Sequence, residues 1–156
     1  MNRFPLIALK DEAATAALAQ RMAPYLSPGD VVALNGGLGA GKTSFARALI
    51  RALSGVDEAE REVPSPTFTL VQSYETPAGR IHHFDLYRIQ SSDELTEIGW
   101  DEALADGIVL VEWPDRAPGI FPPGTQMRLR FTIRVNLHAI ARPRWAFSFY
   151  TTLGTR

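Results

Sequence analysis

The chain contains no cysteine and only two lysines, Lys10 and Lys42. Without cysteine it cannot form a disulfide bond or a thiolate metal site, which agrees with a cytoplasmic protein. It has no apolar run near the roughly 18 residues that a membrane-spanning helix needs, and the apolar part of residues 1–11 is too short for a signal peptide. Its 156 residues, 46% hydrophobic and 21% charged, therefore predict one soluble domain over residues 1–156, with no membrane partner.

Acidic residues are missing from the last part of the chain. All 17 lie before residue 116, whereas seven of the 16 basic residues, all of them arginine, lie from Arg116 onward. Arg128, Arg130 and Arg134 alternate with apolar residues, which predicts a half-buried strand with a basic outer face. Such a face suggests contact with nucleic acid or with an acidic protein surface, and a merely solvated strand explains it equally well.

The strongest motif is a glycine-rich loop at residues 36–44, which matches the phosphate-binding pattern of glycine, four residues, glycine, lysine and serine or threonine. Residues 31–34 before it are apolar and β-branched, which predicts a buried strand, and residues 45–53 after it have the apolar spacing of a helix. Backbone N–H groups at such a helix start favour a phosphate. The predicted nucleotide-binding residues of this loop are Gly36, Gly37, Leu38, Gly39, Ala40, Gly41, Lys42, Thr43 and Ser44.

Lys42 and Thr43 have distinct predicted roles in this loop. The compact ammonium of Lys42 suits the β- and γ-phosphates, and arginine, which this chain uses almost everywhere else, is not equivalent there. The hydroxyl of Thr43 is a predicted ligand of a magnesium ion. Guanine-specific proteins use an Asn-Lys-x-Asp element after the loop, and this chain has no lysine after Lys42, so we expect ATP as the nucleotide.

Glu112 is the first carboxylate expected at the magnesium ion. It directly follows the apolar residues 108–111, and this pattern predicts the end of a core strand beside the loop. There it can hold the metal through water or polarise the attacking water. The neighbouring Trp113 is predicted to pack in the core or to cover the nucleotide.

Asp85 is the second carboxylate of interest, in an alternating strand where it shares a face with His83. An ionisable group in an apolar strand needs a partner, which for Asp85 is magnesium, water or Arg88. A structural ion pair with Arg88 and a role near the γ-phosphate both fit the pattern. Thr67, which follows a stiff Pro-Ser-Pro segment, is interpreted either as a switch hydroxyl at the nucleotide or as the start of a strand.

The hydrophobic periodicity predicts an α/β fold with a mixed sheet. Residues 67–74 and 81–86 are joined so closely that they must pair antiparallel, whereas the strands around the glycine loop form a parallel core. A first helix capped by Asp11 is expected to bury Ala14, Leu18, Met22 and Tyr25, and Ser91 with Glu94 predicts a capping box. The predicted helices lie at 11–26, 45–53 and 91–98, the strands at 31–34, 67–74, 81–86, 108–112, 127–134 and 145–149, and an exposed loop at 56–63.

Four ordered segments together resemble the bacterial TsaE family, formerly called YjeE. They are residues 36–45, 64–71, 83–88 and 110–114, and the similarity extends over about residues 11–134. The resemblance implies a P-loop NTPase-like three-layer fold with parallel core strands, an antiparallel hairpin and C-terminal edge strands. It also implies an ATPase that needs magnesium and hydrolyses ATP slowly.

The same resemblance implies a pathway and roles for individual residues. The family takes part in making threonylcarbamoyladenosine (t6A) in tRNA, together with TsaD and TsaB. Its catalytic positions correspond to Lys42, Asp85 and Glu112, and its magnesium side to Thr43 and Glu112. Gly37 departs from the family, which usually has Asp or Glu there, so any polar contact from this position is in question.

Two further functions remain compatible with the sequence. One is a nucleotide-dependent assembly module in which ATP turnover is incidental. The other is a small-molecule kinase, for which the chain has no evident acceptor-binding lid. The basic face of Arg128, Arg130 and Arg134 is predicted to contact tRNA or an acidic surface of a partner.

Overall fold

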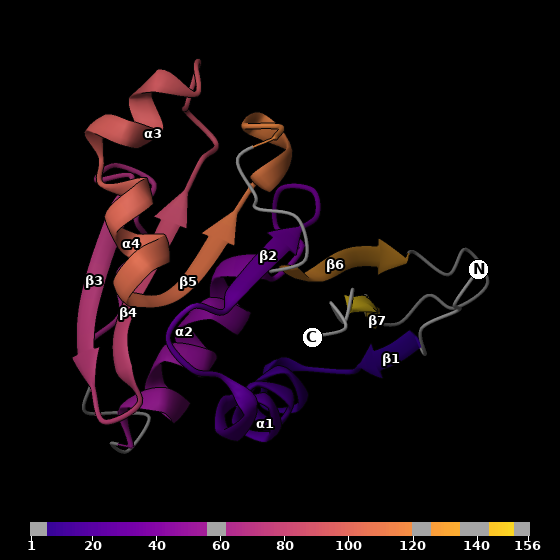
Figure 1. Cartoon of the computed structure of the whole chain (residues 1–156). Coiled ribbons are helices and arrows are strands. Elements are labelled where there is room, and N and C mark those ends of the chain that lie inside the picture. Colours follow the sequence, from indigo (N-terminus) through magenta and orange to yellow (C-terminus); the bar gives the residue numbers. More distant parts are fainter. Residues whose placement is uncertain (1–5, 56–61, 120–125, 135–143, 152–156) are drawn as a thin grey trace.

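A seven-stranded sheet in the order β1-β7-β6-β2-β5-β4-β3 organises the chain (Figure 1). The computed structural model describes residues 6–55, 62–119, 126–134 and 144–151, the last two ranges as backbone. Strands β4, β5, β2 and β6 run parallel, and β3, β7 and β1 pair antiparallel with their neighbours. The predicted α/β fold with a mixed sheet is therefore confirmed. The strands are β1 Leu6–Leu9, β2 Val31–Asn35, β3 Val71–Thr76, β4 Gly79–Asp85, β5 Gly107–Glu112, β6 Gln126–Arg134 and β7 Arg144–Thr151.

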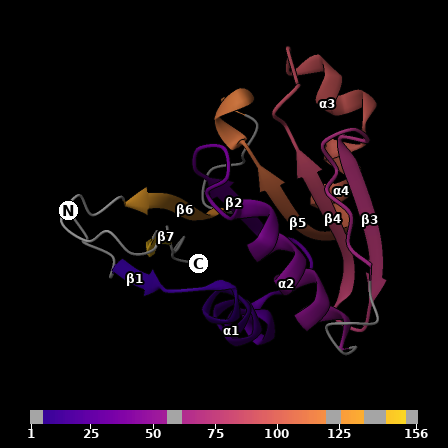
Figure 2. The ribbon, with the colours of Figure 1, turned by 180° about the vertical axis from the view of Figure 1, so that it is seen from behind.

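Helices cover both faces of the central strands. In the two opposite views, α1 and α2 lie on one face and α4 on the other (Figures 1 and 2). Val32 and Leu34 of β2 pack toward α2, whereas Val31 and Ala33 pack toward α4, as the two-residue period of a strand requires. Because both faces are buried, β2 and β5 have continuous apolar sequences. The helices are α1 Glu12–Met22, η1 Ala23–Tyr25, α2 Lys42–Ser54, α3 Asp93–Glu97, α4 Trp100–Asp106 and η2 Pro114–Arg116.

The first helix begins as predicted but ends earlier. Asp11 is its N-cap, with Oδ1 accepting a hydrogen bond from the Ala14 N–H at 2.8 Å. The α-helix stops at Met22 and the short 3-10 helix η1 follows, because Pro24 has no N–H and its ring obstructs a further α-turn. Tyr25 is 83% exposed, so its predicted place on the buried face is wrong.

The predicted strand over residues 67–74 is wrong at its start. Pro66 to Leu70 form a turn instead, closed by the Leu70 N–H donating to the Pro66 carbonyl at 2.6 Å, and β3 begins at Val71. Leu70 has a φ of +67°, a conformation that local residue alternation does not reveal. Its carbonyl accepts a hydrogen bond from the Asp85 N–H at 2.9 Å, so the turn is attached to the end of β4.

The capping box at Ser91 forms only in part. Glu94 Oε1 accepts hydrogen bonds from the Gln90 and Ser91 N–H groups, each at 3.1 Å. The helix itself begins at Asp93, and its N-cap Ser92 makes no side-chain capping bond. The bond from the Ser91 N–H to the Glu94 side chain therefore forms as in a capping box, while the helix starts later than predicted.

Two other segments differ from the predictions. Strand β1, which pairs with β7, was not predicted, because four residues carry too little alternation to identify a strand. In the predicted exposed loop, residues 56–61 lie outside the described residues, and Val63 is buried with its carbonyl accepting from Arg47 Nε at 2.9 Å.

The C-terminal strands are confirmed at the backbone level. β6 and β7 pair antiparallel from Met127 opposite Thr151 to Arg134 opposite Arg144. Their predicted place at the edge is wrong, because β6 lies between β2 and β7, and β7 lies between β6 and β1. The side chains of Arg128, Arg130 and Arg134 lie outside what the structure describes, so their contact with tRNA or an acidic partner stays a prediction. Across the described ranges, no helix has both the length and the apolar character to cross a membrane.

One polar network on the sheet gives a pH-dependent prediction for folding stability. Asp106 accepts from His82 Nε2 and from Arg80 Nη1, each at 2.9 Å, and the hydrogen bond from His82 is the main reason that the pKa of Asp106 is lowered. A lowered pKa stabilises the fold above the unfolded-state value and loses that effect as pH falls through the folded-state value. We expect wild type to exceed Asp106→Asn in unfolding free energy at about pH 5, with the difference shrinking toward about pH 3. Urea denaturation at both pH values checks this, and a difference that does not change with pH would refute it.

Candidate nucleotide-binding site

The glycine loop connects β2 to the N-terminus of α2. Gly41 is the N-cap of α2 with a φ of +98°, and Gly39 has a φ of +71°, which residues with a β-carbon rarely adopt. The loop therefore turns tightly and places the N-terminal N–H groups of α2 at its concave side, an arrangement suited to phosphate. A Cβ added at Gly37 would meet no atom within 4 Å, so the loop conformation does not depend on the glycine at this unusual position.

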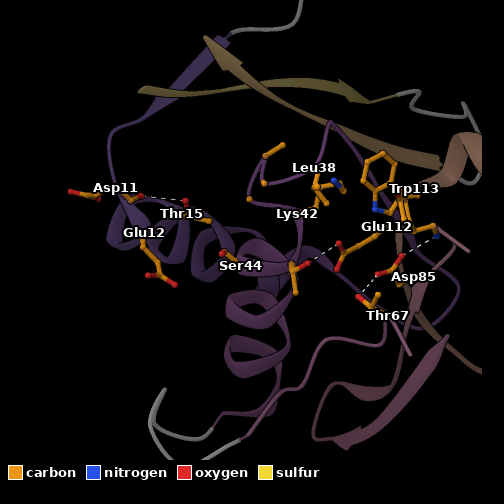
Figure 3. A pocket seen from close by; sticks show the side chains of 15 residues that line it. Asp11, Glu12, Thr15, Leu38, Lys42, Ser44, Thr67, Asp85, Glu112 and Trp113 are labelled. Carbon is orange, nitrogen blue, oxygen red and sulfur yellow. Dashed lines mark hydrogen bonds between the residues drawn. The ribbon is translucent and has the colours of Figure 1, made fainter. Parts of the chain in front are cut away.

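Lys42 lies inside the loop, and its side chain is buried. Its Nζ donates to the carbonyls of Gly36 and Gly37 at 2.8 and 2.7 Å, and it lies 3.8 Å from the centre of the Trp113 ring (Figure 3). Burial lowers the pKa of the ammonium, while the charges of Glu112 and Asp85 oppose that shift. Trp113 therefore packs over the lysine, which agrees with the predicted packing role, and its role as a cover of the nucleotide stays a prediction.

Glu112 ends β5 and is held from two sides. Its Oε2 accepts from the Thr43 hydroxyl at 2.8 Å, and its Oε1 lies 2.9 Å from His83 Nε2. The side chain is only 2% exposed, so these bonds offset part of the desolvation of the carboxylate. Because β5 lies parallel beside β2, the predicted placement of Glu112 next to the loop is confirmed.

Asp85 ends β4 and pairs in register with Glu112 on β5, so both carboxylates lie at the same edge of the sheet. Its Oδ2 accepts from the Thr67 hydroxyl at 2.9 Å and its Oδ1 from the Tyr87 N–H at 3.0 Å. Arg88 instead donates to the Phe68 carbonyl at 3.0 Å. The interpretation of an Asp85–Arg88 ion pair is thus wrong, since Asp85 bonds to the residues flanking the site.

Thr67 lies in the turn before β3 and not at the start of a strand. Besides its bond to Asp85, its hydroxyl lies 2.8 Å from the hydroxyl of Ser65. The bond from Thr67 to Asp85 ties the turn to the end of β4 (Figure 3). Of the two interpretations of Thr67, the structure supports the one that places its hydroxyl at the site.

These side chains surround one cavity of about 520 Å³, a size typical of small-ligand sites. It contains all the predicted site residues from Leu38 to Ser44 together with Thr67, Asp85 and Glu112. Gly36 and Gly37 contribute through their carbonyls to Lys42 instead. Residues that sequence reasoning missed also line it: Asp11, Glu12 and Thr15 of the first turn of α1, and Tyr87.

The donor set around the cavity fits a magnesium ion. A hydroxyl (Thr43) and two carboxylates (Glu112 and Asp85) provide oxygen, the ligand atom that Mg²⁺ prefers, and the phosphates of a nucleotide would supply more. Within the described ranges, no group of three His, Cys, Asp or Glu residues could hold a metal ion.

Known proteins resemble the chain over most of its length. Residues 9–141 match the family model described as Threonylcarbamoyl adenosine biosynthesis protein TsaE. Proteins named tRNA threonylcarbamoyladenosine biosynthesis protein TsaE are similar at 41% identity in Rickettsia felis (76% of this chain, 67% of the relative) and at 42% in Aquifex aeolicus (74% and 81%). The crystal structure of YdiB from Bacillus subtilis superposes with a TM-score of 0.65 at 28% identity, covering 96% of this chain and 86% of that one.

Proposed function

The chain belongs to the TsaE family of threonylcarbamoyl adenosine biosynthesis proteins, and from this premise we propose that it binds ATP with magnesium and hydrolyses the ATP slowly. Its family places it in the biosynthesis of t6A in tRNA. Within that process we propose an accessory role with the TsaD and TsaB proteins, in which the nucleotide cycle supports the modification without this chain transferring the threonylcarbamoyl group.

One observation supports the nucleotide chemistry above all: Lys42, Thr43, Glu112 and Asp85 converge on one cavity of about 520 Å³. They come from three different elements, α2, β5 and β4. The cavity lies at the carboxyl ends of parallel strands, where α/β sheets bind ligands. A glycine-rich turn with no nucleotide would not explain two buried carboxylates directed at the same space.

Each residue then has a chemical task. Lys42 would exchange its two loop carbonyls for phosphate oxygens, and its positive charge would stabilise the negative charge that develops during phosphoryl transfer. Thr43 and Glu112 would hold magnesium, which when bound supplies charge neutralisation at the phosphates. Glu112 or Asp85 would orient the attacking water, and Thr67 would hold Asp85 in place.

The arginines whose side chains the structure describes lie outside the cavity. Arg88 bonds to the Phe68 carbonyl, and the Arg116 guanidinium lies 5.1 Å from the centre of the Tyr87 ring. P-loop NTPases without an arginine at the γ-phosphate hydrolyse roughly 10³- to 10⁵-fold more slowly than with one. We propose a partner protein as the source of acceleration.

Exposed apolar side chains near the loop support a protein partner. Leu38 of the glycine loop and Phe68 of the Thr67 turn are 82% and 84% exposed, so both side chains are accessible to a protein partner. Co-purification with TsaD and TsaB in ATP and in ADP tests the proposal. We expect recovery of the complex to depend on which nucleotide is present, and failure to recover either protein under both conditions would refute the partnership.

Asp85→Asn is expected to separate binding from hydrolysis. The amide keeps the shape of the carboxylate but loses its charge, so ATP should bind within about threefold of wild type. The kcat should fall by about 100-fold, the lower range for loss of a group that positions a proton acceptor. Phosphate release and titration with a fluorescent ATP analogue measure the two effects. An unchanged kcat would assign Asp85 a purely structural role.

A further inference from the structure

His83 is a buried side chain to which the proposed mechanism gives no task. It lies on β4 and is 0% exposed. The adjacent His82 points to the other face, where it bonds to Ser73 and Asp106. His83 instead faces Glu112, with Nε2 2.9 Å from Oε1 of the carboxylate. The two histidines thus have separate environments, and only His83 contacts the site.

The geometry identifies which ring nitrogen of His83 is the donor. An ionised carboxylate only accepts hydrogen bonds, so Nε2 carries the proton that joins His83 to Glu112. The other nitrogen, Nδ1, is buried and has no hydrogen-bond partner in the described part of the chain. A buried polar atom without a partner is unfavourable, and an apolar side chain would fill the position without that penalty. The histidine therefore contributes something other than packing.

The hydrogen bond from His83 complements the one from Thr43. His83 engages Oε1 of Glu112 and the Thr43 hydroxyl engages Oε2, so the carboxylate cannot rotate without breaking one of the two bonds. Because the Thr43 hydroxyl donates its proton to Glu112, the lone pairs of the Thr43 oxygen are directed away from the carboxylate and are available to a metal ion. Thr43 and Glu112, the two predicted metal ligands, both line the cavity. Fixing the Glu112 carboxylate therefore also fixes the orientation of the Thr43 hydroxyl.

We propose that His83 is a positioning residue for the magnesium site, acting through Glu112 and, by way of that carboxylate, through Thr43. This inference rests on the proposed function, since it assigns His83 to the metal side of the same nucleotide site. Partners that orient a metal ligand typically account for 10- to 100-fold in metal affinity or activity. His83 does not itself hold the magnesium ion. Its role is to fix the orientation of Glu112, the carboxylate proposed to hold the ion.

The test compares His83→Leu with His83→Gln and uses Mn²⁺ as the probe, measured by electron paramagnetic resonance with ATP present. Gln places an amide N–H near the position of Nε2, and Leu removes the donor. We expect His83→Leu to lose about tenfold or more in Mn²⁺ affinity and in kcat, and His83→Gln to stay within about threefold of wild type in both. Loss in both variants alike, or in neither, would overturn the positioning role.

His82→Leu is the matched control, because it changes the neighbouring histidine on the opposite face and should leave Mn²⁺ affinity unchanged. If His83→Leu does not fold, long-range ¹H–¹⁵N correlation of the wild-type imidazole decides the question. A proton on Nε2 that responds to Mg²⁺ with ATP supports the inference, and a proton on Nδ1 overturns it. If wild type itself binds no Mn²⁺ with ATP, the proposed function fails. Normal wild-type binding with an unaffected His83→Leu refutes this inference alone.

Discussion

Lys42→Ala is expected to lower the affinity for ATP by at least about 100-fold. The ammonium is buried within the loop, where it donates to the Gly36 and Gly37 carbonyls, and phosphate oxygens would replace these acceptors on binding. Two charge-assisted hydrogen bonds contribute about 3 kcal/mol together, and each 1.4 kcal/mol corresponds to about tenfold in affinity. Isothermal titration calorimetry with ATP and Mg²⁺ measures the loss.

Two controls accompany the Lys42 variant. Lys10→Ala removes the only other lysine of the chain, which is exposed and outside the cavity, and should bind ATP like wild type. Lys42→Arg keeps the charge but has a planar, larger head group that does not fit a site shaped for an ammonium, so we expect it to bind weakly as well. Wild-type affinity in Lys42→Ala, with the variant folded, would mean that the loop is not a phosphate site.

Glu112→Gln is expected to reduce kcat by about 100- to 1000-fold while ATP still binds within a few fold. The glutamine has one acceptor oxygen and one donor nitrogen, so it cannot accept from both Thr43 and His83 as the carboxylate does. It also removes the negative charge proposed for the metal and for the water. Removing a side chain that accepts a proton in the reaction typically lowers the rate by about 10²- to 10⁴-fold. The decrease expected for Glu112→Gln lies at the lower end of this range.

Single-turnover phosphate release and ATP binding, measured on the same preparation, check the Glu112 prediction. Glu97→Gln is a suitable control, because Glu97 is exposed at the end of α3 and outside the cavity. A variant that binds ATP and retains wild-type kcat would remove Glu112 from the chemistry. A variant that cannot hydrolyse ATP but still supports t6A formation would favour the assembly-module function, in which ATP turnover is incidental.

The residues whose position at the cavity was predicted from the sequence share a local signal. The loop, Lys42 and Thr43 form one contiguous motif, and Glu112 follows an apolar run whose length and β-branched residues are typical of a buried strand. Parallel strands next to the loop then bring Glu112 to its position, because the carboxyl ends of such strands meet at one edge. For these residues, a short stretch of sequence indicates both the functional group and its position at the edge of the sheet.

The residues that sequence reasoning missed depend on contacts between distant segments. The turn at Pro66 to Leu70 exists because the Leu70 carbonyl bonds to the end of β4, a partner 15 residues away that local alternation does not include. Asp11 and Glu12 line the cavity only because α1 packs beside α2. In the sequence, the position of His83 is that of a core residue. Its contact with Glu112 can be recognised only in the folded chain, where β5 places Glu112 beside it.

The most direct test of an ATP-driven role in t6A biosynthesis is the t6A content of tRNA, measured by nucleoside mass spectrometry. The host is a bacterial strain depleted of its own TsaE and supplied with this chain or a variant. We expect depletion to lower t6A, wild type to restore it, and both Lys42→Ala and Glu112→Gln to fail although they are expressed and folded. Unchanged t6A after depletion, or full restoration by both variants, would contradict this role.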